Sequence, residues 1–166
     1  ALIGSGGREH ALCMSFKKSR NISKIYCFPG NAGTNLIAEN VDLNLKNFQI
    51  IKEFIIEKNI DLIVIGPEEP LVDGLTDYLE NQKIKVFGPN KLASQLEGSK
   101  IFTKKLCEKY NIPTAKFGFF NNFNDAENYL EKCNLPIVIK ADGLAAGKGV
   151  YICENKKQSY HAIQEI

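Results

Sequence analysis

The stretch Leu2-Ile3-Gly4-Ser5-Gly6-Gly7-Arg8-Glu9-His10 decides the fold class of the first half of the chain. Its apolar start predicts a strand, its glycines predict a tight turn, and a helical pattern follows over about residues 8 to 19. At such a turn, free backbone N–H groups and the positive end of the helix dipole favour an anion. An arginine beside the turn can bind a phosphate through two parallel hydrogen bonds. We therefore predict that Gly6, Gly7 and Arg8 bind a phosphate.

This turn differs from a dinucleotide-binding fingerprint in two respects. Glu9 stands where the third glycine of G-x-G-x-x-G would fall, and Phe28-Pro29 stands where a ribose-binding carboxylate would end the second strand. We expect a phosphate there and not NAD. Two structural alternatives stay open: glycines that only join a strand to a helix, and a His10 that packs or caps.

The same alternation of strand and helix continues outward from the turn. Further strand-like runs lie at 25–28, 62–65 and 86–87, and helical patterns lie at 47–59 and 72–82. This alternation predicts an α/β domain over 1–90, with a parallel sheet covered by helices on both faces. The helix over 47–59 is the clearest, because Asn47 can cap it and four residues at helical spacing form its apolar stripe: Phe48, Ile51, Phe54 and Ile55.

Two more loops follow strands of this sheet, at Pro29 to Thr34 and at Gly66 to Leu71. In an open parallel sheet, ligands bind in the crevice at the carboxyl ends of the strands. We therefore expect the three loops to form one small-molecule pocket, with Asn31 and Gly33 beside the first turn. Glu68 or Glu69 would suit an amine or a sugar hydroxyl, and exposed turn acids are the alternative.

After Gly88-Pro89 the pattern changes. Two helical segments at 91–96 and 99–110 predict a helical connection over 91–113, which ends at the stop signal Asn111-Ile112-Pro113. A second domain is expected over 114–166. Its predicted elements are a strand at 116–120, a helix at 125–133, strands at 137–140 and 150–153, and a helix from 156 onward.

A second glycine-rich loop, Lys140 to Val150, joins the last two predicted strands. It is not a P-loop, because Gly149 replaces the Ser or Thr that would hold magnesium and a strand follows instead of a helix. Such a hairpin can lay backbone N–H groups and Lys148 over a polyphosphate. Lys140 ends an apolar strand, where a lysine is expected to enter a polar cleft or pair with an acid. We predict that both lysines contact nucleotide phosphates.

Composition excludes several classes of function. The chain has 21 Lys and Arg against 19 Asp and Glu, mixed along its length, so no basic stripe for nucleic acid exists. No apolar run approaches the roughly 18 residues of a membrane span, and the first residues do not show a basic segment followed by an apolar run, so we expect a protein that is neither secreted nor membrane-bound. The five cysteines have no metal-binding spacing, which favours reduced, buried thiols and a cytoplasmic protein.

Five motifs in order resemble the phosphoribosylamine-glycine ligases, or glycinamide ribonucleotide synthetases, of the ATP-grasp superfamily. The motifs are Gly4 to Leu12, Pro29 to Thr34, Gly66 to Leu71, Gln95 to Lys100 and Lys140 to Val150. The resemblance implies a parallel-sheet pre-ATP-grasp domain followed by the beginning of an ATP-grasp domain with a glycine-rich hairpin flap. It implies ligation of glycine to 5-phosphoribosylamine through a glycyl phosphate, an early step of purine synthesis.

The resemblance also implies roles for particular residues. Residues matching the family's ATP contacts and flap are Lys100, Lys140, Asp142, Gly143, Gly147, Lys148 and Gly149. The first turn and the Asn31 to Gly33 loop would receive the ribose phosphate. The family's magnesium-binding acids are expected beyond Ile166, since the chain starts inside a strand and stops within a helical pattern, as a fragment would. Such a fragment is expected to be inactive, and no catalytic residue or oligomeric state is predicted.

Three alternatives differ in class. One is another ATP-grasp ligase or a component of a biotin-dependent carboxylase, against which the Gly7 to His10 and Pro29 to Gly33 motifs argue. The second is a noncatalytic nucleotide-binding module. The third is a Rossmann oxidoreductase, weakened by Glu9 and the missing acid. The shift of melting temperature with each ligand would separate them.

Overall fold

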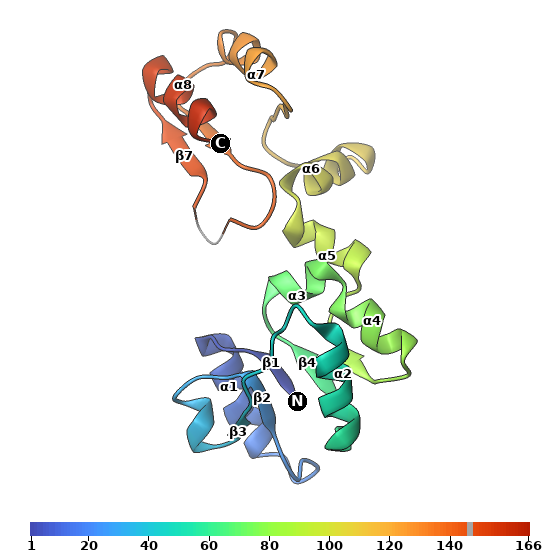
Figure 1. The fold of residues 1–166 in the computed structure, drawn as a ribbon. Helices are drawn as coiled ribbons and strands as arrows, with labels where there is room; N and C mark the ends of the chain where they lie inside the picture. Colours follow the sequence, from blue (N-terminus) through green and yellow to red (C-terminus); the bar gives the residue numbers. More distant parts are fainter. Residues whose placement is uncertain (146–147) are drawn as a thin grey trace. The chain divides into compact units, whose positions relative to one another are not determined.

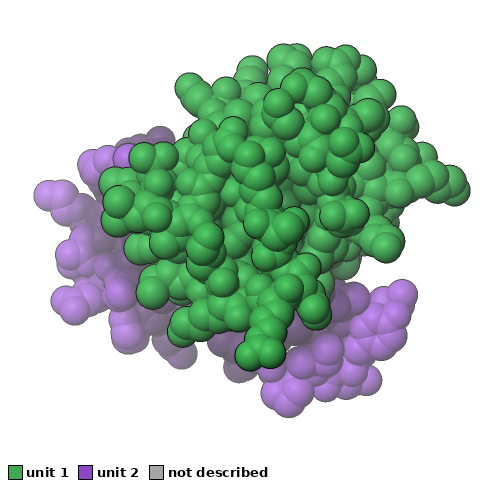
Figure 2. All heavy atoms as spheres, turned by 90° about the horizontal axis from the view of Figure 1, so that it is seen from below, with its two compact units in different colours: residues 1–95 green, residues 96–166 purple. Residues whose placement is uncertain are grey.

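The computed structural model describes residues 1–145 and 148–166, which form two compact units, 1–95 and 96–166 (Figure 2). Each unit has its own β-sheet. The finer division of the chain into 1–90, a helical connection over 91–113 and 114–166 stays a prediction. Among the described helices, none combines the length and the hydropathy that a membrane crossing needs.

The first unit contains a five-stranded parallel sheet with the strand order β3-β2-β1-β4-β5. Its strands are β1 (Leu2–Gly4), β2 (Tyr26–Pro29), β3 (Glu39–Asn40), β4 (Ile63–Ile65) and β5 (Val86–Phe87). All four neighbouring pairs are parallel, so every strand ends at the same edge of the sheet. The predicted α/β class and parallel sheet are confirmed. β3 was not predicted from the sequence.

Helices cover both faces of this sheet (Figure 1). They are α1 (Gly7–Lys17), α2 (Phe48–Glu57), α3 (Glu68–Asp73) and α4 (Leu75–Asn81), with a 3-10 turn at Thr34–Leu36. Helix α5 (Lys91–Gly98) follows and spans the boundary between the two units. Alternate strand residues point to opposite faces. Ile3 and Phe28 pack with α2 and α4, whereas Leu2 and Cys27 pack with Cys13 of α1.

The helix predicted over 47–59 forms as expected. The Asn47 side chain accepts a hydrogen bond from the Ile50 amide at 3.3 Å, and Ile51 and Ile55 are buried against the sheet. The single helix predicted over 72–82 is wrong, because α3 and α4 are separated at Gly74, whose φ of 98° lies in the left-handed region. Only glycine adopts this conformation without strain, so the helix breaks there.

The second unit contains α6 (Lys100–Lys109), α7 (Phe123–Leu130), the antiparallel pair β6 (Ile137–Lys140) and β7 (Val150–Cys153), and α8 (Lys156–Glu165). Helices α7 and α8 pack together, and α8 contacts both strands. Cys153, on the face of the hairpin that α8 covers, and Ala162 of α8 are both buried. The opposite face leaves Val138 and its cross-strand partner Ile152 exposed.

The strand predicted at Lys116 to Phe120 is wrong. The alternating aromatic pattern favours a strand, but a strand needs a neighbour that pairs its backbone N–H and C=O groups. Within the described residues, neither β6 nor β7 pairs with this segment. Side chains of α6 hold it instead: Lys104 Nζ donates to the Ala115 carbonyl at 3.0 Å, and Lys105 lies over the Phe119 ring.

Candidate functional site

The three loops of the first unit meet at the carboxyl edge of its sheet. The amide of Gly30 donates to the Gly4 carbonyl at 3.1 Å, and the amide of Gly66 donates to the Ile3 carbonyl at 3.1 Å. The loops after β2 and β4 therefore start beside the loop after β1. This is the convergence that the parallel order of the strands predicts.

The second loop is tied to the first by Asn31. Its side-chain amide donates to the carbonyls of Ser5 (2.9 Å) and Gly6 (3.2 Å), while its Oδ1 accepts from the amides of Gly33 (2.8 Å) and Thr34 (3.0 Å). Asn40 of β3 also stabilises the second loop, because its Nδ2 donates a hydrogen bond to the Asn31 carbonyl at 2.8 Å. Asn31 therefore shapes the loops, and Asn40 is a supporting residue that sequence reasoning missed.

Arg8 ties the first loop to the third. Its Nη1 donates to the Gly66 carbonyl at 2.8 Å, and its Nη2 lies 3.3 Å from Glu68 Oε1. Both side chains are largely exposed, so this ion pair adds little stability. The sequence predicts a loop at Glu68, but Glu68 is the first residue of α3. Pro70 does not prevent this helix, because a proline is tolerated in the first turn of a helix.

Glu9 is a buried carboxylate that sequence analysis treated only as a missing glycine. Its side chain is 5% exposed, and its Oε2 accepts a hydrogen bond from the Gly6 amide at 2.7 Å. A Cβ at Gly4 or at Gly66 would come within 2.6 Å or 2.1 Å of this side chain. The three glycines leave room for Glu9, and a glutamate three residues after a helix cap is the signal that could have revealed it.

The phosphate site predicted at Gly6, Gly7 and Arg8 has a defined geometry. All three residues are exposed at the start of α1, and the Gly6 carbonyl already accepts from the His10 amide at 3.1 Å. Because Glu9 accepts from the Gly6 amide, the N–H groups of Gly7 and Arg8 are the ones that an anion could use. His10 packs its ring against Gly33, which supports the structural alternative for this histidine.

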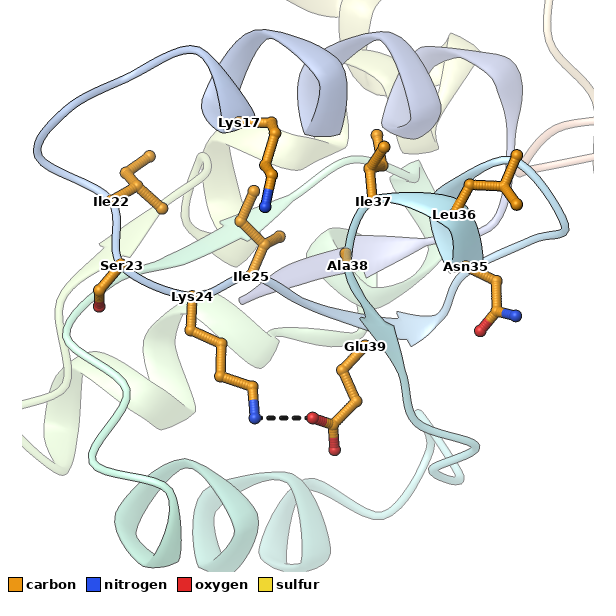
Figure 3. Close-up of a pocket in the computed structure, with 10 residues that line it drawn as sticks. All are labelled: Lys17, Ile22, Ser23, Lys24, Ile25, Asn35, Leu36, Ile37, Ala38 and Glu39. Atoms are coloured by element: carbon orange, nitrogen blue, oxygen red, sulfur yellow. Dashed lines mark ion pairs between the residues drawn. The ribbon is translucent and has the colours of Figure 1, made fainter.

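One cavity of the first unit lies away from these three loops. Figure 3 shows this cavity of about 370 Å³ beside the end of α1, with the Lys24 to Glu39 ion pair at its rim. Its walls precede β2 and β3, so it lies at the amino ends of the strands. Since ligands of open parallel sheets bind at the carboxyl ends, this cavity is not the candidate site.

In the second unit, the hairpin formed by β6 and β7 carries the predicted lysines. Lys140 ends β6 on the exposed face of the hairpin, and Lys148 is also exposed. Gly143 and Gly149 both have left-handed φ values, +85° and +68°, and the Ala141 amide donates to the Gly149 carbonyl at 2.9 Å. The predicted glycine-rich turn therefore places glycines at two positions where other residues would be strained. The predicted site residue Gly147 lies outside the described residues.

Asp142 and Lys100 are brought together by contacts between α6 and the residues after β6. Asp142 accepts from the Ile101 amide at 3.1 Å and from the Ser99 hydroxyl at 3.0 Å, and Lys100 Nζ donates to the Gly143 carbonyl at 2.8 Å. Burial alone would raise the pKa of Asp142, but these hydrogen bonds outweigh it and lower the pKa below its ordinary value.

Metal ligands are not gathered in the described parts of the chain. No group of three or more His, Cys, Asp or Glu side chains that could hold a metal ion lies within residues 1–145 and 148–166. The five cysteines form no disulfide in the structure, and three of them, Cys13, Cys27 and Cys153, are buried.

The match of residues 98–166, which carry the glycine-rich hairpin, to an ATP-grasp domain places the chain in the class of ATP-grasp proteins. The chain belongs to the phosphoribosylglycinamide synthetase family. Residues 1–97 match the model of its N domain, and residues 98–166 match the model of its ATP-grasp (A) domain. Members of the ATP-grasp class use ATP together with a divalent metal.

Similar proteins bear the name phosphoribosylamine–glycine ligase. The ligase of Clostridium acetobutylicum is 48% identical over 98% of this chain, and that of Mesorhizobium japonicum is 50% identical over 98%. These matches cover 39% and 38% of the two relatives, so the chain spans about two fifths of their length.

Solved structures show the same fold. The crystal structure of phosphoribosylamine–glycine ligase from Thermotoga maritima matches with a TM-score of 0.74 and 34% identity, covering 96% of this chain and 37% of that one. N5-carboxyaminoimidazole ribonucleotide synthetase from Thermus thermophilus matches with a TM-score of 0.77 over 99% of this chain and 43% of that one. Because this protein is only 16% identical to the chain, the match shows a similar fold and nothing about function.

Proposed function

We propose that this chain belongs to a cytoplasmic enzyme that joins glycine to 5-phosphoribosylamine at the expense of ATP, giving glycinamide ribonucleotide, ADP and phosphate. The observation that carries the proposal is that both units match the same synthetase family in order. The five free cysteines fit a reducing compartment.

The chemistry requires an activated carboxylate. A glycine carboxylate oxygen attacks the γ-phosphorus of ATP, the bond to the leaving β-phosphate oxygen breaks, and glycyl phosphate forms. The amine nitrogen of phosphoribosylamine then attacks the glycyl carbonyl carbon, phosphate leaves, and the nitrogen loses a proton. Catalysis of this kind depends mainly on positioning and on neutralising charge at the transferred phosphoryl group.

The second unit would hold the nucleotide. The exposed hairpin face combines apolar side chains, such as Val138 and Ile152, with the ammonium group of Lys140. An apolar surface suits a purine base, and lysines at its end suit the phosphates. We assign Lys100, Lys140 and Lys148 to these phosphates, with the backbone of Gly143, Gly147 and Gly149 in the flap.

The first unit would hold phosphoribosylamine. Its ribose phosphate would bind the amides of Gly7 and Arg8 and the Arg8 guanidinium, in the turn that includes Gly6. Asn31 and Gly33 would shape the adjoining wall, as their hydrogen bonds in the second loop allow. Glu68 would act through its ion pair with Arg8, by directing the guanidinium.

Magnesium does not fit the described residues as a bound group. Their acids do not gather in a set of three or more, and Asp142 already accepts hydrogen bonds from Ile101 and Ser99. We expect the magnesium ligands in the part of the enzyme that follows Ile166.

The experiment compares the full-length enzyme with the 166-residue chain. Each is incubated with ATP, magnesium, glycine and freshly generated phosphoribosylamine, and phosphate release is measured. The full-length enzyme should release phosphate only when both acceptor substrates are present, and the chain should bind ATP weakly without turnover. Turnover without glycine, or with bicarbonate in its place, would reject the proposed substrates.

A further inference from the structure

Three hydrogen bonds join the start of α6 to the residues after β6, across more than 40 positions of sequence. Two of them end on the carboxylate of Asp142, one at each oxygen, and the third joins Lys100 Nζ to the Gly143 carbonyl. We call this set the α6 clamp. All of its residues lie in the second unit.

The position of Asp142 suits a carboxylate for two reasons. The Ile101 amide is one of the first N–H groups of α6, which have no partner within the helix. The positive end of the ten-residue helix also stabilises a negative charge placed there. Ser99 completes the arrangement, because its hydroxyl donates to Asp142 and accepts from the Phe102 amide at 3.0 Å.

The clamp controls the position of a lysine. Lys100 is the first residue of α6, and Lys140 is the last residue of β6, two positions before Asp142. Holding Asp142 against α6 therefore fixes the first turn of the helix, with Lys100, at the end of the strand that carries Lys140. Without these hydrogen bonds, the position of the Lys100 ammonium group relative to that of Lys140 would not be fixed.

We propose that Asp142 is a positioning residue that aligns Lys100 with Lys140 for the ATP phosphates, and does not itself contact the nucleotide. This inference rests on the proposed function. Both of its carboxylate oxygens already accept hydrogen bonds, and a carboxylate beside a polyphosphate would be repelled by it. The proposal gives Asp142 an indirect role toward ATP where the sequence predicts direct ATP binding.

The first test measures the clamp without any activity. Amide hydrogen exchange is followed at Ile101 in the 166-residue chain. Asp142→Ala should speed this exchange about tenfold, whereas Asp142→Asn, which can still accept from Ile101, should stay within a few-fold of wild type. Asp125→Ala is the matched control, since this exposed aspartate near the start of α7 has its hydrogen bonds, among the described residues, with Asn122. Unchanged exchange in Asp142→Ala would overturn the clamp.

The second test separates positioning from direct contact in the full-length enzyme. Asp142→Ala removes both hydrogen bonds to the carboxylate and should raise the KM for ATP at least about tenfold, and Asp142→Asn, which keeps an acceptor for the Ile101 amide, should recover most of that loss. If Asp142→Asn is as defective as Asp142→Ala, the carboxylate acts directly on the nucleotide or its metal, and the inference is wrong. A wild-type KM in Asp142→Ala would also overturn it.

Two outcomes remain to be distinguished. If Asp142→Ala fails to fold, Ser99→Ala is used instead, because it removes the hydrogen bond that the Ser99 hydroxyl donates to Asp142. This variant should also raise the KM for ATP, and an unchanged KM would refute the positioning role of Asp142. If the wild-type enzyme shows no glycine-dependent turnover, the proposed function fails. In that case faster exchange at Ile101 in Asp142→Ala would leave the clamp standing as a structural tether only, and its role toward ATP would be rejected.

Discussion

Replacing Gly33 by alanine should destabilise the first unit through one contact. The backbone at Gly33 is helical, with φ of −71°, so alanine meets no conformational strain there. An added Cβ would instead lie 2.3 Å from Cε1 and 2.5 Å from Nδ1 of His10, whereas ordinary van der Waals contact begins at 3.4 Å. The ring or the loop must move, and overpacking of this kind typically costs about 1–3 kcal/mol.

Thermal unfolding measures this cost. For a unit of this size, a loss of about 1–3 kcal/mol corresponds to a fall in Tm of roughly 5–20 °C for Gly33→Ala. Gly7→Ala is the matched control, because an added Cβ there meets nothing within 4 Å. In the double variant Gly33→Ala/His10→Ala the clash is absent, so the two effects should not add. A Gly33→Ala protein as stable as wild type, or strictly additive effects, would refute the reasoning.

The remaining predictions concern buried and ionised groups. Glu9→Ala should lower the free energy of unfolding by about 2 kcal/mol, because the Gly6 amide loses its charged acceptor; urea titration measures this, and Glu9→Gln should lose less. Burial raises the pKa of Cys27 to about 12, so iodoacetamide at pH 8 should label the partly exposed Cys107 and Cys133 before Cys27, as followed by mass spectrometry; equal rates for the three would contradict this. The pKa of Asp142 is lowered, so its stabilisation is present above the ordinary value of 3.8 and is lost as the pH falls through the lowered pKa. An NMR titration followed at the neighbouring Ile101 amide should therefore have its midpoint below pH 3.8, and a midpoint above that value would contradict the hydrogen bonding.

The sheet was predictable because its strands are short apolar runs between loop signals. Ile3, Phe28 and Ile63 are fully buried, and burial of this kind leaves a strong pattern in the sequence. β3 left no such pattern, since Glu39 and Asn40 are polar and join the sheet only by pairing with β2.

The candidate site was predictable in outline and not in detail. Loops that follow parallel strands must lie at one edge, so the approach of the Asn31 loop to the first turn follows from topology. The buried position of Glu9 and the support from Asn40 depend on contacts between segments far apart in sequence, which no local pattern encodes. The pairing of Asp142 with α6 is hidden for the same reason, because 41 residues separate it from Ile101.

The hydrogen bonds of the second loop have a consequence for the kinetics and thermodynamics of binding. Asn31, Thr34 and Asn40 form hydrogen bonds with one another, and Thr34 is fully buried. The second loop is therefore already ordered in the folded domain, before any ligand binds. A ligand that docks against a preorganised wall does not have to order it, which saves about 0.5–1.5 kcal/mol for each side chain already fixed. Calorimetric titration should accordingly find little unfavourable entropy from this loop, and association through it should follow rigid-body docking rather than a slow rearrangement.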